Sequence, residues 1–455
     1  MTKPTFQFGA EVALRNLTAL MPPGSLQARF AGGAIWTTAG CAFSQAMSVV
    51  SGIVLARLLG LHGFGEFAIV QATVLSLTTF GDLGLGLSTT KHIAAARKAT
   101  PGWIPQIIRV SSGVVVCAGL LLSCVLVAAS GRMANRLLGD SAHGAAFAIA
   151  AALLVLELLN RLQLGCLSGL QAFRRSAQVQ IVRGFALVVL PAAFALRFGL
   201  MGALGGLALV SLCTCALSHA YLVKECEPLR GGPRESTGGA LRSLLGMAGA
   251  VWISGVMLAG STYAAKIALA GAHGGMNEMG LLNAAEKWRV AVEFLASMLS
   301  QVSIPIMAGA FSEGMRDRLR KLLIGTHVAA LATASAAALV ITMGSGIIMR
   351  AYGPDFARGR EVLVICAVAA VITAAYSVGS AALWAFGRIR LMLILDAVKA
   401  AAIVCCVFAG LVNSANSYAW VSLVSVLLGL AGMALALRSE LRAMRSPAPS
   451  AYVIT

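Results

Sequence analysis

Three charged residues, Glu286, Arg289 and Glu293, follow one another at spacings of three and four inside a long apolar segment of this 455-residue chain. These spacings place them on one face of a helix, where opposite charges can pair. A charge in hydrocarbon costs about 2.5 to 3.5 kcal/mol on insertion scales, so such residues normally face an internal cavity or one another. The face therefore either lines a cavity that receives an ionic ligand or carries purely structural pairs.

Other apolar segments also contain charges, including Asp82, Arg161, Asp396 and Lys399. Arg57 closes one segment, and Lys266 has a similar place in a later one. A guanidinium or an ammonium in a low-dielectric cavity is a strong partner for a diphosphate. Arg57, Arg161, Lys266 and Arg289 are the candidate diphosphate-binding cations, and Asp82, Glu286, Glu293, Asp396 and Lys399 are the candidate polar groups of the cavity or its gate. The alternative for Arg57 and Lys266 is that their side chains extend to the outer headgroups.

Helical spacing also suggests local pairs. Glu157 and Arg161 are four residues apart, in the favourable order for an ion pair. Asp396 and Lys399 are three apart and could pair with each other, or Asp396 could pair with Arg183 if their helices approach. Asp82 lies in the glycine-rich run Gly81-Asp82-Leu83-Gly84-Leu85-Gly86, which permits close helix contact or bending.

Composition places the chain in a membrane, because 58% of its residues are hydrophobic and only 11% are charged. A membrane helix needs about 20 residues, and this rule predicts about twelve spans. They lie near 31–59, 65–90, 107–130, 144–170, 177–197, 200–223, 241–271, 279–310, 322–349, 361–386, 390–411 and 416–437.

The basic residues predict the orientation. With the N-terminus in the cytoplasm, 22 of the 35 Lys and Arg residues are cytoplasmic, 7 are on the other side and 6 lie within spans. The positive-inside rule therefore predicts two cytoplasmic termini, and insertion accounts for most of the +18 charge without a nucleic-acid partner.

Two pairs of similar short segments indicate an internal duplication. Residues 170–175 read LQAFRR and residues 383–388 read LWAFGR, at an offset of 213, while residues 65–71 and 280–286 open corresponding spans at an offset of 215. We expect two parallel six-helix repeats, because six crossings return the chain to its starting side. The predicted parts are a cytoplasmic tail at 1–30, a lobe at 31–224, a linker at 225–240, a second lobe at 241–438 and a cytoplasmic tail at 439–455.

The sequence carries no recognised catalytic, nucleotide-binding or metal-binding motif. We therefore expect no cofactor, no metal and no catalytic residue. Transport would be driven by a H⁺ or Na⁺ gradient or by the membrane potential.

The chain resembles the Wzx-type polysaccharide flippases of the multidrug/oligosaccharidyl-lipid/polysaccharide (MOP) exporter superfamily. The similar residues are Leu55-Ala56-Arg57-Leu58-Leu59-Gly60, Gly63-Phe64-Gly65-Glu66-Phe67 and the run from Phe80 to Gly86. Gly199-Leu200-Met201-Gly202-Ala203 and Ala385-Phe386-Gly387-Arg388 also fit.

The resemblance implies an all-helical, V-shaped transporter of two six-helix lobes that flips a polyprenyl-diphosphate-linked oligosaccharide across a bacterial inner membrane. Arg57 and Lys266 would hold the diphosphate, with membrane lipids and a polysaccharide polymerase or chain-length protein as further partners. One alternative is a MOP-like exporter of drugs or small molecules, which the excess of internal Lys and Arg over Asp and Glu disfavours. Another is a membrane-embedded polymerase or glycosyltransferase, which would typically have a larger outer loop than those near 131–143 and 350–360.

Overall fold

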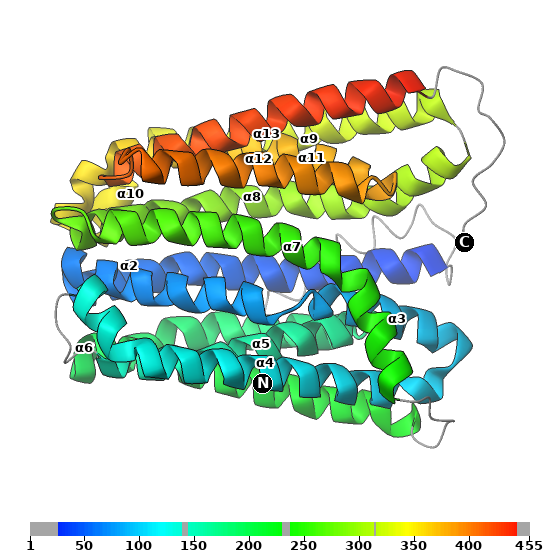
Figure 1. Ribbon diagram of the computed structural model, residues 1–455, viewed down its shortest axis with the longest axis horizontal. Helices are drawn as coiled ribbons and strands as arrows, with labels where there is room; N and C mark the ends of the chain where they lie inside the picture. Colours follow the sequence, from blue (N-terminus) through cyan, green and yellow to red (C-terminus); the bar gives the residue numbers. More distant parts are fainter. Residues whose placement is uncertain (1–25, 139–143, 230–236, 314, 444–455) are drawn as a thin grey trace, which may run out of the picture. The chain divides into compact units, whose positions relative to one another are not determined.

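The computed structural model describes residues 26–138, 144–229, 237–313 and 315–443. Most of the predicted tails, and residues 230–236 of the predicted linker, lie outside the described residues. In the described part the long elements are all helices, and their bounds are α2 (Leu26–Gly81), α3 (Leu85–Ala99), α4 (Ile104–Met133), α5 (Gly144–Gly169), α6 (Phe173–Cys226), α7 (Thr237–Ala270), α8 (Gly275–Ser312), α9 (Arg316–Met343), α10 (Ser345–Tyr352), α11 (Arg360–Ala385), α12 (Ile389–Phe408) and α13 (Ala415–Ala443) (Figure 1).

Helices are the required solution here, since backbone groups in hydrocarbon must be satisfied within their own segment. Among the described residues, nine helical stretches are long and apolar enough to cross a membrane. Two of them exceed one crossing and bend at Gly60 and Gly199, and α8 adds a further helix of 38 residues. With both halves of the bent helices counted, this gives the twelve crossings that the sequence predicts.

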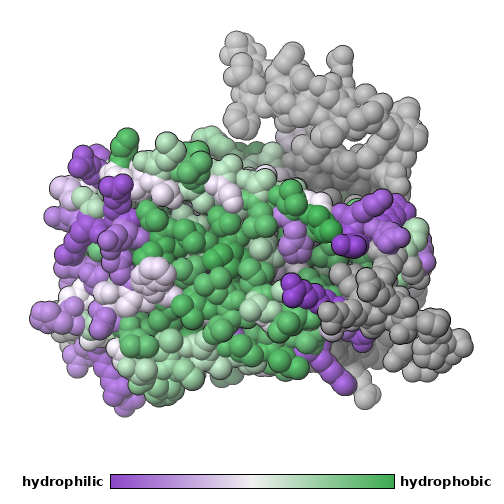
Figure 2. Space-filling view, turned by 90° about the horizontal axis from the view of Figure 1, so that it is seen from above, coloured by the Kyte–Doolittle hydropathy of each residue, from purple (hydrophilic) through white to green (hydrophobic). Residues whose placement is uncertain are grey.

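The surface has the polarity that a bilayer demands. Figure 2 shows a face on which apolar side chains fill a broad middle zone between hydrophilic ends. Large apolar side chains such as Leu339, Val340 and Leu435 are more than 60% exposed. Such a surface is stable only when lipid covers it.

The helices form two compact units. Unit 1 comprises residues 1–60 and 70–252, and unit 2 comprises residues 61–69 and 253–455. The short segment 61–69 thus groups with the second half of the chain although it belongs to the first half in sequence. The lobe boundaries expected from the sequence stay a prediction.

In unit 1, α5 packs against α3, α4 and α6. Glycines allow two close contacts in this unit, one between α5 and α3 and one within α6. A β-carbon on Gly165 would lie 2.9 Å from the Gly86 carbonyl oxygen, and one on Gly206 would lie 2.5 Å from the Pro191 backbone. The second contact folds the two halves of α6 against each other about Gly199, where φ is 55°. Gly206 therefore allows close packing between the two halves of this helix.

In unit 2, α11 lies at the centre and packs against α8, α9 and α13. The segment 61–69 joins α8 through a reciprocal glycine contact. A β-carbon on Gly65 would lie 1.8 Å from the Met276 carbonyl oxygen, and one on Gly280 would lie 2.4 Å from the Leu61 carbonyl oxygen. Gly65 and Gly280 are 215 residues apart, and so are Leu61 and Met276. The sequence repeat at this offset therefore marks a contact that equivalent residues make in both directions.

The other repeated segment, residues 170–175 and 383–388, is aligned differently in the structure. Helix α6 begins at Phe173 and α12 at Ile389, an offset of 216 instead of 213. The turns before them match at this offset, because the Ala172 N–H donates to the Leu167 carbonyl and the Arg388 N–H donates to the Leu383 carbonyl, both at 2.9 Å. The repeated letters are therefore three residues out of register with the repeated backbone.

Candidate functional site

The first polar cluster lies inside unit 1, where α5 and the two halves of α6 meet. The Glu157 carboxylate on α5 accepts hydrogen bonds from Arg183 Nη2 at 2.8 Å and from Ser211 Oγ at 2.6 Å. One turn further, the Asn160 amide donates to Thr214 Oγ1 at 2.7 Å. The Glu157 and Arg183 side chains are 19% and 24% exposed, so the pair is only partly removed from solvent.

Arg161 follows Asn160 and is exposed. The sequence suggests a pair between Glu157 and Arg161, but the structure gives the short contact of Glu157 to Arg183. Arg161 interacts electrostatically with Asp82 and Glu157 over a longer range. In the part of the chain that the structure describes, it has no carboxylate within ion-pair distance.

Asp82 stands at a break between two helices. Helix α2 ends at Gly81 and α3 begins at Leu85, and the turn between them uses positive φ angles of 49° at Leu83 and 70° at Gly84. A β-carbon on Gly86 would lie 3.2 Å from Asp82 Oδ1, so the carboxylate sits over the first turn of α3. The positive end of that helix favours a carboxylate there. Discontinuous membrane helices of this kind form the substrate sites of many transporters.

Two glycines of α5 hold the broken helix near Arg161. Gly165 packs against Gly86 and Thr90 of α3, and Gly169 packs against Thr90 and Ile93. The Thr90 hydroxyl also donates to the Gly165 carbonyl at 2.9 Å. Sequence analysis missed this contact, although the spacing from Gly165 to Gly169 is the small-xxx-small signal of close helix packing.

Arg57 is also exposed, three residues before the bend at Gly60. Arg57 takes part in an interaction within the protein. Its role as a diphosphate-binding residue stays a prediction.

A second cluster lies inside unit 2. Lys266 Nζ on α7 donates to Glu286 Oε2 on α8 at 2.6 Å. Along α8, Arg289 lies 3.2 Å from Glu293 and 3.9 Å from Glu286. The shared face expected for Glu286, Arg289 and Glu293 is confirmed, and both predicted cations of this unit already have carboxylate partners. All four side chains keep 14% to 24% of their surface exposed.

A third cluster, also in unit 2, is more deeply buried. Asp396 on α12 accepts hydrogen bonds from Lys399 Nζ at 3.0 Å, from the Tyr376 hydroxyl at 2.8 Å and from Ser254 Oγ. The Asp396 and Lys399 side chains are only 9% and 8% exposed, and the ammonium lies 4.0 Å from the centre of the Tyr376 ring. Gly429 of α13 leaves room for the lysine chain, since a β-carbon there would lie 2.6 Å from Lys399 Cδ.

This third cluster confirms the pair of Asp396 with Lys399. Arg183, the other suggested partner of Asp396, pairs with Glu157 inside unit 1. Sequence reasoning missed Tyr376 and Ser254, because isolated Tyr and Ser residues on other helices carry no spacing signal. The repeat offset of 216 could have pointed to Tyr376, which is equivalent to Asn160 of the first cluster.

Comparison with solved structures supports one fold. An inward-facing MATE family multidrug resistance transporter of the MOP superfamily superposes with a TM-score of 0.72 at 16% identity, over 88% of this chain and 95% of that one. The lipid II flippase MurJ in an inward closed conformation superposes with a TM-score of 0.71 at 11% identity, over 90% of each chain. An outward-facing MATE transporter gives a TM-score of 0.67 at 16% identity, over 95% of this chain and 98% of that one.

A comparison with curated protein sequences finds no match. The family model described as polysaccharide biosynthesis protein matches residues 30–311, which is more than half of the chain. The chain therefore belongs to the polysaccharide biosynthesis protein family, and its fold is the one that these MATE transporters and MurJ share.

Proposed function

We propose that this protein flips a polyprenyl-diphosphate-linked oligosaccharide from the inner to the outer leaflet of a bacterial inner membrane. The product would supply surface polysaccharide synthesis, such as O-antigen, capsule or exopolysaccharide. The family match supports a role in polysaccharide biosynthesis, and a lipid II flippase shares the fold.

The observation that carries the proposal is that Arg161 is exposed and that, among the described residues, no carboxylate lies within ion-pair distance of it. An exposed guanidinium inside a membrane helix is costly unless it faces water or an anion. Glu157, the carboxylate nearest to it in sequence, is engaged by Arg183 and Ser211. A planar guanidinium binds phosphate oxygens through two parallel hydrogen bonds, so a diphosphate is a fitting ligand for Arg161.

Lys266 and Arg289 would act differently, because they are already paired. Their pairs are partly exposed, so a diphosphate oxygen could replace Glu286 or Glu293 with little further loss of solvation. With such an exchange of partners, Lys266 and Arg289 could bind an anion and then re-form their ion pairs after the anion leaves. The Asp396–Lys399 pair is too buried for this role and is assigned to structure.

The driving force would be an electrochemical one. Moving one charge through 100 mV is worth about 2.3 kcal/mol, so a headgroup with about two negative charges gains roughly 4 to 5 kcal/mol on leaving a negative cytoplasm. Coupling to a H⁺ or Na⁺ gradient is the other source. With both termini in the cytoplasm, as the basic residues predict, polymerase or chain-length proteins would receive the product on the outer side.

The test uses vesicles that contain the purified protein and a fluorescent polyprenyl-diphosphate oligosaccharide. The Arg161→Gln variant should slow transfer between leaflets by at least about tenfold, because it loses a charge-assisted bidentate contact. Arg161→Lys should retain part of the activity, since it keeps the charge and loses the fork geometry. Arg197→Gln, which changes another exposed arginine, is the matched control.

Two results would count against the proposal. Equal transfer by the parent protein and Arg161→Gln would remove Arg161 from the substrate site. Transfer of small organic cations by the parent protein, with no transfer of the lipid-linked oligosaccharide, would favour the small-molecule exporter that shares this fold.

A further inference from the structure

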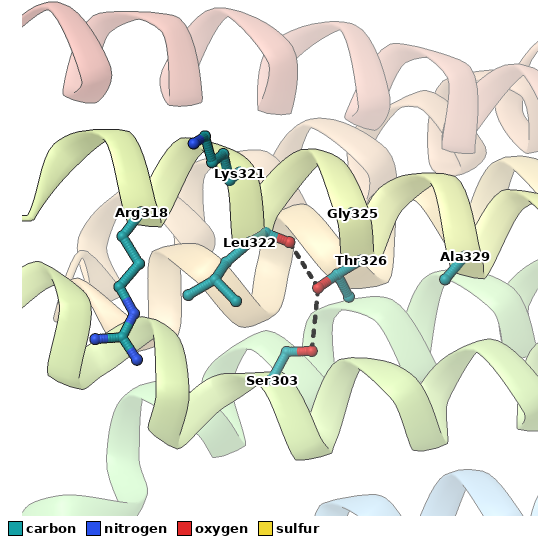
Figure 3. Close-up of a pocket in the computed structure, with 7 residues that line it drawn as sticks. All are labelled: Ser303, Arg318, Lys321, Leu322, Gly325, Thr326 and Ala329. Atoms are coloured by element: carbon teal, nitrogen blue, oxygen red, sulfur yellow. Dashed lines mark hydrogen bonds between the residues drawn. The ribbon is translucent and has the colours of Figure 1, made fainter.

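A cavity of about 670 Å³ lies between α8 and α9 of unit 2. The described residues that line it are Ser303, Arg318, Lys321, Leu322, Gly325, Thr326 and Ala329. Figure 3 shows the two cations at one end of this stretch of α9, with Arg318 extending toward α8, and Gly325 and Ala329 farther along the helix. The cavity is thus cationic at one end and mostly apolar along its length.

The cationic end is not neutralised within the described part of the chain. Arg318 and Lys321 are both exposed, and no described carboxylate lies within ion-pair distance of either one. Glu313 and Asp317, the acidic residues nearest in sequence, are exposed and do not line the cavity. Two cations beside a cavity whose described lining holds no carboxylate indicate an anionic ligand.

Two hydroxyl groups lie farther along the cavity than Leu322, between Leu322 and Ala329 (Figure 3). Ser303 Oγ and Thr326 Oγ1 are 3.3 Å apart, and Thr326 Oγ1 donates to the Leu322 carbonyl at 2.8 Å (Figure 3). These hydroxyls are the polar groups in the otherwise apolar stretch of the described lining. A β-carbon on Gly325 would meet nothing within 4 Å, so the cavity is open beside this residue.

The place of the cavity in the membrane identifies the class of ligand. The candidate span of α9 begins at Asp317, so Arg318 and Lys321 lie in its first turns, at one membrane surface. From there the apolar lining runs into the hydrocarbon region, beside the exposed Ile324 and Val328. Phosphate at the surface and an acyl chain along the helix is the arrangement of a phospholipid.

We propose that this cavity is a binding site for one anionic glycerophospholipid, with its phosphate at Arg318 and Lys321 and an acyl chain along Leu322, Gly325 and Ala329. The lipid is a resident ligand and not the transported substrate. The site therefore stands whether or not the protein flips lipid-linked oligosaccharides.

Native mass spectrometry of the purified full-length protein, titrated with phosphatidylglycerol or phosphatidylcholine, tests the site. The parent protein should retain one phosphatidylglycerol in clear preference to phosphatidylcholine. A nearby Lys or Arg is worth about 1 kcal/mol toward anionic lipid, which is about fivefold in affinity, so Arg318→Gln with Lys321→Gln should weaken binding roughly 25-fold. Gly325→Leu should weaken binding without a change of charge, by filling the apolar part.

Arg320→Gln is the matched control, because Arg320 is an exposed cation of the same helix that does not line the cavity. It should bind phosphatidylglycerol like the parent. Excess glycerol phosphate separates a lipid site from a phosphate site, and it should not displace the lipid. The proposal is overturned by equal binding of the two lipids, by an unaffected double variant, by displacement with glycerol phosphate, or by retention of a polyprenyl phosphate in place of phosphatidylglycerol.

Discussion

Arg183 in unit 1 and Lys399 in unit 2 occupy equivalent places in the two repeats, 216 residues apart, but their surroundings differ. Arg183 pairs with Glu157 on a neighbouring helix, and both side chains remain about one-fifth exposed. Lys399 pairs with Asp396 on its own helix, and both side chains are more than 90% covered. The repeats have kept a cation at one backbone position while changing its partner and its burial.

This difference in burial changes how strongly each cation depends on its partner. A covered pair has lost its solvation and depends on its partner, so removing one member is very costly. A partly exposed pair depends less on its partner and can exchange it for an ion from solution. Under the proposed function, burial separates the structural pair from the pairs that could bind substrate.

The largest expected effect comes from breaking the covered pair. Asp396→Ala leaves the Lys399 ammonium buried without its carboxylate and should lower the free energy of unfolding by about 3 to 5 kcal/mol. Thermal unfolding of the purified protein, followed by circular dichroism, measures the loss. The double variant Asp396→Leu with Lys399→Met should recover most of it, because it removes both charges. A double variant as unstable as the single one would refute the structural role of the pair.

An intermediate effect is expected where the two repeats are alike. Gly65→Ala and Gly280→Ala each place a methyl group against a carbonyl oxygen of the other segment, and each should cost about 1 to 3 kcal/mol by overpacking. The same unfolding measurement applies. Gly113→Ala is the control, since a methyl group there meets nothing and helix propensity predicts a small gain. If only one of the two variants is destabilised, the contact is not reciprocal.

The smallest effect on stability is expected at the partly exposed pair of unit 1. Glu157→Gln keeps a hydrogen-bond acceptor for Ser211 and Arg183 and leaves a cation that solvent can reach, so the loss should be about 1 kcal/mol. The comparison with Asp396→Ala is direct, because the two variants alter the carboxylate partners of equivalent cations. A loss at Glu157 as large as that at Asp396 would remove the distinction between the two regions.

Much of the fold could be predicted from the sequence because hydrophobic length and helical spacing are local properties of the chain. The twelve crossings follow from hydrophobic length. The shared face of Glu286, Arg289 and Glu293 and the pair of Asp396 with Lys399 follow from spacing along one helix. The pair of Glu157 with Arg183 could not be predicted, because it joins α5 to α6, and helical spacing favoured Arg161 instead. The offset of 213 was wrong for a related reason. It was taken from four identical residues, whereas the structural offset of 216 comes from the turn geometry, which cannot be read from a sequence.

The candidate site was harder to predict than the fold. Exposed Arg161 and paired Lys266 are equally conspicuous as charges in an apolar sequence, and only tertiary packing separates them. The role of Gly165 and Gly169 in positioning α3 against α5 was not predicted, since a glycine has no side chain that could indicate a site. These contacts nevertheless bring Asp82 toward Arg161.

The most direct test of the central claim is leaflet transfer by the unmodified protein in sealed vesicles. A labelled polyprenyl-diphosphate oligosaccharide should move between leaflets faster than in protein-free vesicles. Movement away from the compartment held negative should accelerate when a potential is imposed, because the headgroup carries about two negative charges. Transfer no faster than in protein-free vesicles, with or without a potential and ion gradients, would contradict the account.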